Sequence, residues 1–387
     1  MLESIYRGLS HPGLPLDPTI LDAITSEHAR GVVETFLNRF DSTLEQSGDG
    51  LASCLTGWLE HNAALHDVWN TSFGAVERLA SSEDPSASNV LFSAAQLALS
   101  MMAAGLEGRF QVKFEDPVRL RFDRWCLPAA TGVAAECGRG SVDIRLGDTG
   151  VRPLALRRPS GSAWRLERSG GGLEELTQVQ MGDNQVTFLS DSVFEGGYDL
   201  NFPFPIDASG EKTAAAWRAA FQLLGEQAPE YLDWVDRVIQ DIIPLKVPNQ
   251  AMVSGSHNMH WGEVFMTSIL EPLKFAEMLV HESSHQYYLI GCMLSNVEDG
   301  SDRKLYYSPA KKKERPLDKI LLAYHAFANV ILMYRRCREA GLETRAEEAK
   351  LLPEVEELEK PLRQTRGLTE LGVSLWRPLA QRLEESS

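Results

Sequence analysis

Cysteine and long apolar runs are scarce in this sequence. Its 387 residues include five cysteines, and no two of them form a CxxC pair, so we expect neither a secreted disulfide framework nor a zinc ribbon. The longest nearly apolar run, residues 321–334, falls short of the roughly 20 residues of a membrane span. The first residues lack the basic start and continuous apolar segment of a signal peptide. These absences predict a soluble cytoplasmic protein without a membrane partner.

Positive charge is also in deficit. The chain has 38 Lys and Arg against 54 Asp and Glu, a formal net charge of −16. Such a field repels a phosphate backbone, so nucleic acid is not expected as a partner. No glycine-rich loop of the dinucleotide-binding or phosphate-binding kind is present. Neutral or basic partners, peptides among them, stay open, and the sequence does not indicate an oligomeric state.

Composition divides the chain into three ranges. Residues 1–110 are rich in Leu, Ala and Glu at helical spacing, whereas residues 111–210 contain short alternating runs between glycine-containing turns. The second range is a candidate peptide-binding region. Residues 211–387 are predicted to be the catalytic part. We therefore predict an α+β fold with a helical N-terminal region, a strand-rich middle and a helical C-terminal domain.

The third range contains three helical patterns and one strand pattern. An amphipathic helix is expected over about 211–240, and a strand or hairpin over 251–267. A long helix should start near Ser268, since Ser268 and Glu271 have capping-box spacing. A second long helix opens at Pro316 and runs to about Ala340, where Gly341 stops it. Its centre is apolar on nearly every side, so we expect it to be buried.

The first of these long helices contains the motif HESSH, His281 to His285. Histidines four residues apart lie one turn above one another on a helix and can bind one metal ion. This HExxH pattern predicts a zincin-like metal-site domain, with His281 and His285 as metal ligands and Glu282 as a catalytic residue. Two histidines leave the site incomplete, because a catalytic metal normally has three protein ligands.

The third ligand has several candidates. The metzincin pattern requires a histidine where this chain has Ser295, so that pattern fails. Glu298, Asp299 and Asp302 are acidic alternatives, but acidic residues beside glycine in a loop are commonly turn formers. His325 is the better candidate, because a histidine within an apolar helix needs partners for both ring nitrogens and a metal supplies one without a buried charge. His257 and His260, on the predicted strand, are weaker candidates for metal binding.

Two kinds of chemistry are compatible with the motif. A zinc hydrolase would use Glu282 as general base on a metal-bound water. A non-heme iron oxygenase would instead bind 2-oxoglutarate beside the metal, and it needs a cation for the distal carboxylate of that cosubstrate. Arg315, just before the second long helix, is placed to point inward, whereas the lysine run 311–313 reads as solvated surface.

Four strings of this chain resemble one family: LVHESSHQYY, EDGSD, LYYSPAKKKERPLDKILLAYHAFANV and the helix after it. They are similar to HExxH-motif proteins encoded beside precursors of ribosomally synthesised, post-translationally modified peptides. The resemblance covers about residues 250–340. It implies a peptide-modifying enzyme, and some members act as iron(II)- and 2-oxoglutarate-dependent hydroxylases of a side-chain β-carbon.

Carried onto this chain, the resemblance implies metal ligation by His281, His285 and a downstream histidine, here His325. In the family pattern a histidine lies about one turn earlier in that helix, where this chain has Leu322. Arg315 and Tyr307 would contact the cosubstrate, and the partner would be a precursor peptide with its leader and core. The alternatives are a zinc metallopeptidase and a non-catalytic peptide-binding module.

Overall fold

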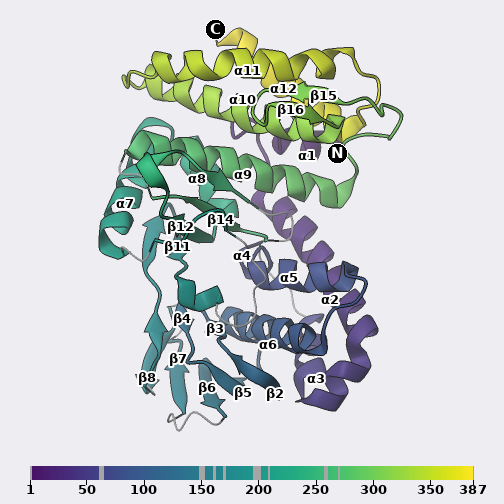
Figure 1. Cartoon of the computed structure of the whole chain (residues 1–387), viewed down its shortest axis with the longest axis vertical. Helices are drawn as coiled ribbons and strands as arrows, with labels where there is room; N and C mark the ends of the chain where they lie inside the picture. Colours follow the sequence, from purple (N-terminus) through teal and green to yellow (C-terminus); the bar gives the residue numbers. More distant parts are fainter. Residues whose placement is uncertain are drawn as a thin grey trace.

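The computed structural model describes residues 2–60, 65–147, 153–159, 163–168, 171–194, 202–207, 210–256, 260–268 and 271–386. Helices and strands both contribute substantially, which confirms the α+β class. Figure 1 shows three levels along the long axis: a six-stranded sheet with N-terminal helices at one end, a second sheet in the middle, and a layer of C-terminal helices at the other end.

The first range is helical, as predicted. Asp17 caps the longest of its helices by accepting a hydrogen bond from the Thr19 amide, and Ser86 caps another through the Asn89 amide. Gly105, at φ +115°, ends that second helix in the left-handed region that glycine favours. The helices are α1 (Leu2–Gly8), α2 (Pro18–Ser47), α3 (Leu51–Trp58), α4 (Leu65–Val68), α5 (Thr71–Ser81) and α6 (Ala87–Ala104).

The strands of the second range form an antiparallel sheet of order β1-β2-β5-β6-β7-β8, to which the first range adds β1. Along β2 and β6, buried and exposed residues alternate, so one face packs against the helices and the other is open to solvent. Its strands are β1 (Gly48–Asp49), β2 (Gly108–Val118), β5 (Ala130–Gly138), β6 (Ser141–Leu146), β7 (Leu154–Arg157) and β8 (Arg165–Arg168). A small sheet beside it comprises β3 (Arg121–Phe122), β4 (Trp125–Cys126) and β9 (Glu174–Glu175).

The central sheet combines strands from the second and third ranges. Its order is β10-β11-β12-β14-β13, with β12 parallel to both β11 and β14 and the two outer pairs antiparallel. The hairpin expected over 251–267 is confirmed, because β13 pairs with β14. These strands are β10 (Gln178–Met181), β11 (Asn184–Phe188), β12 (Asp241–Leu245), β13 (Ser254–Gly255) and β14 (Glu263–Thr267), with short 3-10 helices at Asp191–Phe194 and Pro248–Gln250.

The C-terminal helices pack on one another and on the central sheet (Figure 1). They are α7 (Gly210–Gln227), α8 (Pro229–Val238), α9 (Pro272–Leu294), α10 (Leu317–Glu339), α11 (Arg345–Gln364) and α12 (Glu370–Glu385), and the hairpin of β15 (Tyr306–Ser308) and β16 (Lys313–Arg315) precedes α10. The predicted ends of α10 are confirmed: Pro316 caps it and Gly341, at φ +102°, follows it. Its predicted burial is confirmed as well.

Two predicted boundaries were wrong. The helix that carries HESSH begins at Pro272 rather than near Ser268, because proline at the first helical position sets the start and Glu271 takes the capping position. The helix expected over 211–240 is two helices, since Pro229 has no amide hydrogen and begins a new one after Ala228. The three ranges also interleave in space, because α1 packs against α12.

Among the described residues, two helices are long and apolar enough to span a membrane by length and composition alone. They are α6 and α10, and 67% and 72% of their apolar windows are buried inside the protein. A core helix shows the same combination of length, composition and burial.

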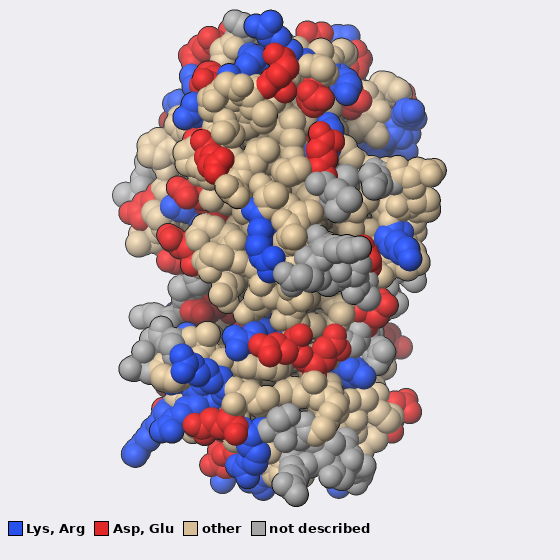
Figure 2. All heavy atoms as spheres, turned by 90° about the vertical axis from the view of Figure 1, so that its left-hand side faces the viewer, with Lys and Arg blue, Asp and Glu red and all other residues tan. Residues whose placement is uncertain are grey.

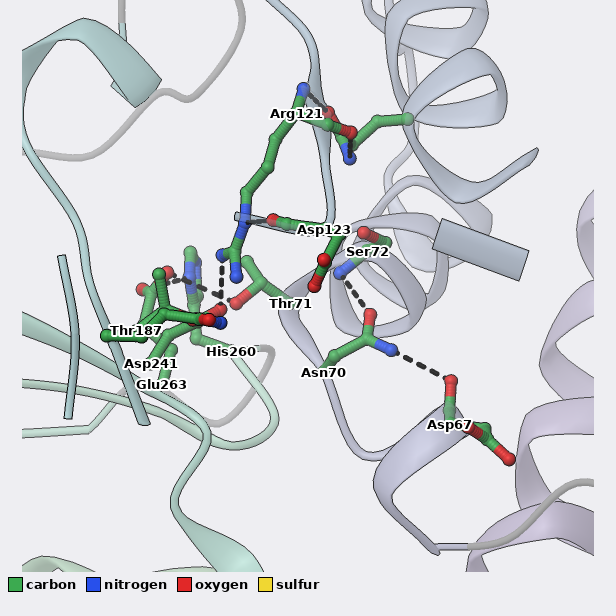
Figure 3. A network of polar contacts seen from close by, with 12 residues as sticks. Asp67, Asn70, Thr71, Ser72, Arg121, Asp123, Thr187, Asp241, His260 and Glu263 are labelled. Atoms are coloured by element: carbon green, nitrogen blue, oxygen red, sulfur yellow. Dashed lines mark hydrogen bonds and ion pairs between the residues drawn. The ribbon is translucent and has the colours of Figure 1, made fainter. Parts of the chain in front are cut away.

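A buried polar network joins the levels (Figure 3). Arg121 of β3 donates to Asp241 of β12 at 2.7 Å. Asp241 lies directly opposite Glu263 in the parallel pair of β12 and β14. Glu263 in turn contacts Thr71 at 3.1 Å and His260 at 2.9 Å. His260 therefore serves this junction, and His257, the other of the two weaker candidates, lies outside the described residues.

Candidate metal centre

The HESSH motif lies on α9 with its ligand atoms together. One donor atom each from His281, Glu282 and His285 lies within 4.8 Å of the others. The two imidazole rings are 4.7 Å apart between centroids and nearly perpendicular. The predicted juxtaposition of the two histidines is therefore present, and a carboxylate accompanies them.

The far side of α9 fixes the orientation of the motif. The Tyr287 ring stacks on Trp234 at 4.2 Å between centroids, and its hydroxyl donates to the Trp234 carbonyl. The Gln286 carboxamide oxygen accepts a hydrogen bond from the Gly262 amide at 3.0 Å. Because these contacts hold the helix against α8 and the chain before β14, they fix the rotation of α9 and with it the directions of the two histidines and Glu282.

Glu282 is buried and connected to the edge of the central sheet. The Ser254 hydroxyl, on β13, donates to Oε1 of Glu282 at 2.6 Å. Oε2 has no hydrogen-bond partner within the described residues. Burial raises the pKa of this carboxyl to about 7, although hydrogen bonds from Ser254 and Ser256 and the charge of Lys311 oppose the rise. A carboxyl with this pKa can hold or release a proton near neutral pH.

The two motif histidines are neutral in the metal-free chain. Burial, followed by the charge of Lys311, lowers the pKa of His281 to about 4. Burial also lowers the pKa of His285 well below its ordinary value, and the neighbouring histidines contribute. Nδ1 of His285 has no hydrogen-bond partner within the described part of the chain. Neutral imidazoles are the form that coordinates metal ions, so the pair needs no deprotonation before binding.

A cavity of about 850 Å³ opens over the motif. The motif and β13 form one part of its wall, and α10 forms another through Leu322, Ala323 and Phe327. Further lining comes from the loop 296–300 and from the hairpin of β15 and β16. The candidate metal centre is thus accessible from a space large enough for a small organic molecule together with part of a peptide.

His325 does not complete the centre, contrary to the prediction. Its Nδ1 lies 3.0 Å from the Ser284 carbonyl and its Nε2 lies 3.1 Å from the Leu9 carbonyl, so both ring nitrogens already have main-chain partners. The ring is fully buried and burial lowers its pKa to about 4, so it is neutral and donates one of these two hydrogen bonds. The side chain one turn earlier, Leu322, is the one that lines the cavity.

The acidic alternatives divide between the cavity and its surroundings. Glu298 and Asp299 line it, whereas Asp302 accepts hydrogen bonds from the Tyr306 and Thr365 hydroxyls outside it. Among the described residues, none of the three joins the group that lies within 4.8 Å. The third donor beside the two imidazoles is therefore the Glu282 carboxylate.

Cations line the same cavity. Arg315 does so, as predicted, and within the described residues it makes no ion pair. Lys311 and Lys319 line it too, although the lysine run had been read as solvated surface. Lys319 was missed, but it precedes the cavity residues Leu322 and Ala323 by three and four positions, a spacing that shares one helix face.

Tyr307 was wrongly predicted to contact a cosubstrate. It pairs with Glu314 in the β15–β16 hairpin, and its side chain is 51% exposed and does not line the cavity. The neighbouring Ser308 is buried and does line it. Successive residues of a strand point to opposite faces, so only one of the two can reach the cavity.

Comparison with known proteins adds no family to this geometry. No protein-family model matches the chain, and no curated protein matches it.

Proposed function

We propose that this protein is an iron(II)- and 2-oxoglutarate-dependent hydroxylase that oxidises a side-chain β-carbon of a ribosomally synthesised precursor peptide. One observation carries the proposal: the same cavity contains two neutral imidazoles with a carboxylate and, on the hairpin of β15 and β16, Arg315 and Lys311, which make no ion pair within the described residues. The first set suits a metal ion and the second suits an anionic cosubstrate. The resemblance to HExxH peptide-modifying proteins supports the peptide as substrate.

The residues present fit a bound metal ion. His281, His285 and Glu282 would hold it, and two histidines with one carboxylate are the donor set typical of non-heme iron(II) oxygenases. Nδ1 of His285 and Oε2 of Glu282 are buried and have no hydrogen-bond partner within the described residues. Buried polar atoms normally have a partner, and a metal ion would supply one. When bound, the metal would supply dioxygen chemistry.

Arg315 and Lys311 provide the anion-binding part. A guanidinium recognises a carboxylate through two parallel hydrogen bonds, and Arg315 has no competing ion pair within the described residues. Lys311 is close enough to the motif for its charge to lower the pKa of His281 and Glu282. Together they favour a small dicarboxylate near the metal ligands.

The arrangement around α9 also supports a zincin-like domain. The helix that bears HExxH lies beside a sheet whose edge strand, β13, contacts the motif through Ser254 and Glu282. The cavity exceeds the needs of a small cosubstrate, and its remaining wall includes Leu289, Leu322 and Phe327. We assign this apolar part to a side chain of the peptide core.

A zinc metallopeptidase is the second candidate, and one observation favours it. Glu282 has a pKa of about 7 and an Oε2 without a hydrogen-bond partner among the described residues, so it could serve as the general base if zinc were bound. In the hydroxylase Glu282 binds the metal, whereas in the peptidase it accepts a proton. Glu282→Gln should therefore lower iron content in the first case and abolish cleavage with zinc retained in the second.

Mass spectrometry of a precursor peptide after co-expression tests the proposal. Hydroxylation adds the mass of one oxygen atom and requires 2-oxoglutarate and dioxygen, with succinate formed in step. A shortened peptide would replace the hydroxylase by the peptidase. An unchanged peptide, together with a purified chain that takes up neither iron nor zinc, would favour a non-catalytic peptide-binding module.

A further inference from the structure

The charge of this acidic chain is unevenly distributed. Residues 108–168, which contain most of the six-stranded sheet, hold twelve Lys or Arg against seven Asp or Glu, although the whole chain has a net charge of −16. Figure 2 views the molecule from the β8 side and shows Lys and Arg atoms gathered at the lower left, over the end of the molecule that this sheet occupies. The sheet therefore attracts acidic groups that the rest of the surface repels.

Strand β8 forms the edge of that sheet. Within the described residues it pairs with β7 alone, and all four of its residues are exposed. Trp164, immediately before it, is buried and donates from its indole nitrogen to the Ala103 carbonyl at 2.8 Å. This anchor holds the start of β8 in place. The edge is thus a fixed row of main-chain groups available to a further strand.

Arginines crowd the open face beside this edge. Arg157 of β7 lies directly opposite Arg165 of β8, and like charges in such cross-strand pairs are destabilising. Arg168 follows on the same face, opposite Ala155. Arg157 has Glu167 at 3.4 Å and Arg168 has Asp143 at 3.7 Å, with all four side chains more than half exposed, and such ion pairs contribute little. An acidic side chain on an added strand would relieve this repulsion.

We propose that β8 is a docking edge for an extended acidic peptide segment, which adds to the sheet as a further strand with its acidic side chains against Arg157, Arg165 and Arg168. Strand addition derives affinity from main-chain hydrogen bonds and specificity from alternate side chains. The inference rests on the proposed peptide substrate in one respect: the docked segment would belong to the leader of the precursor. Its test does not require catalysis.

The test measures fluorescence anisotropy of a labelled peptide of alternating glutamate and threonine with the full metal-free chain. We expect binding that weakens at high salt and weakens about tenfold in Arg157→Glu/Arg165→Glu. The matched control is Lys350→Glu/Lys360→Glu, which makes the same charge change on exposed residues of α11. It should change the affinity less than about twofold. Circular dichroism and thermal unfolding verify that both variants fold.

Two further probes define the mode of binding. The same peptide with N-methyl groups on alternate amides cannot form one row of strand hydrogen bonds and should bind more weakly. Equal losses in both double variants, no binding of the acidic peptide, or binding of a single-stranded oligonucleotide in its place would overturn the inference. If the chain binds the acidic probe but never hydroxylates a precursor, the docking edge stands and the proposed function falls. If it hydroxylates a precursor but does not bind the acidic probe, the proposed function stands and the docking edge falls.

Discussion

The Ser254 hydroxyl donates a 2.6 Å hydrogen bond to Oε1 of Glu282, and so couples the edge strand β13 to the metal-binding motif on α9. This bond favours the ionised carboxylate while burial opposes it. Ser254 therefore acts as a positioning residue that orients the carboxylate from the wall of the cavity.

The pKa of Glu282 predicts how stability depends on pH in the metal-free chain. Its folded value, about 7, lies above the ordinary 4.5, so the folded chain binds the extra proton between these values. The contribution of this carboxyl to the free energy of unfolding is full below about pH 4.5 and is lost as the pH rises through about 7, a change on the order of 3 kcal/mol. Burial lowers the pKa of His281, His285 and His325, and these groups add stability as the pH rises, so the net curve does not isolate Glu282. Urea unfolding with a chelator present should show the loss as the difference in pH dependence between the unsubstituted chain and Glu282→Gln.

His325→Ala should destabilise the fold without removing the metal. The substitution leaves one of the Ser284 and Leu9 carbonyls without its imidazole donor and opens a cavity, at a cost of about 2–4 kcal/mol. Iron content after reconstitution and thermal unfolding are the measurements. His281→Ala and His285→Ala are the controls, and both should lose metal. Loss of metal in a folded His325→Ala chain would restore His325 as a ligand.

Arg315→Gln should weaken 2-oxoglutarate binding. Removal of a charged, two-point contact costs about 1.5–3 kcal/mol, so we expect the KM for 2-oxoglutarate to rise about tenfold or more while iron content stays the same. Arg303→Gln is the control, because Arg303 is exposed in the same segment and does not line the cavity. An unchanged KM in Arg315→Gln would assign the cosubstrate to other cations.

Arg121→Gln should be strongly destabilising. Asp241 and Glu263 are both buried, and without the guanidinium Asp241 becomes an uncompensated charge, at a cost of about 3–5 kcal/mol. Asp241→Asn in the same chain should recover part of this loss, because it removes the orphaned charge. Arg157→Gln, whose ion pair is exposed, should change the free energy of unfolding by less than about 1 kcal/mol. Chemical denaturation compares all three.

Local sequence patterns predicted only the part of the metal centre that lies within a single helix. The spacing of His281 and His285 determines their geometry, and the ends of α10 follow from Pro316 and Gly341. The role of His325 depends on Leu9, far away in the sequence, and no local pattern contains that contact. A buried histidine with two carbonyl partners looks the same in sequence as a buried metal ligand.

The strand-rich range illustrates the same limit. Alternation predicted its strands, but not that β11 would pair with β12 across two helices to complete the central sheet. The side of the β15–β16 hairpin that reaches the cavity was also undetermined, because a shift of one residue exchanges Tyr307 and Ser308. The residues of one segment determine whether it forms a helix or a strand. They do not determine its pairing register or its partners far away in the sequence.

The contacts of the first turns with the last helix affect how the chain can be made. The Ser10 hydroxyl donates to the Leu375 carbonyl. The Ser10 carbonyl accepts a hydrogen bond from the Asn329 side chain, and the Leu9 carbonyl contacts the His325 ring. Ser10 and Leu375 are 365 residues apart in the sequence, so the ribosome makes one long before the other. The contact of the first turns with α12 can therefore form only after α12 has emerged, and the early segment waits for it with the Ser10 hydroxyl not yet bonded to the Leu375 carbonyl.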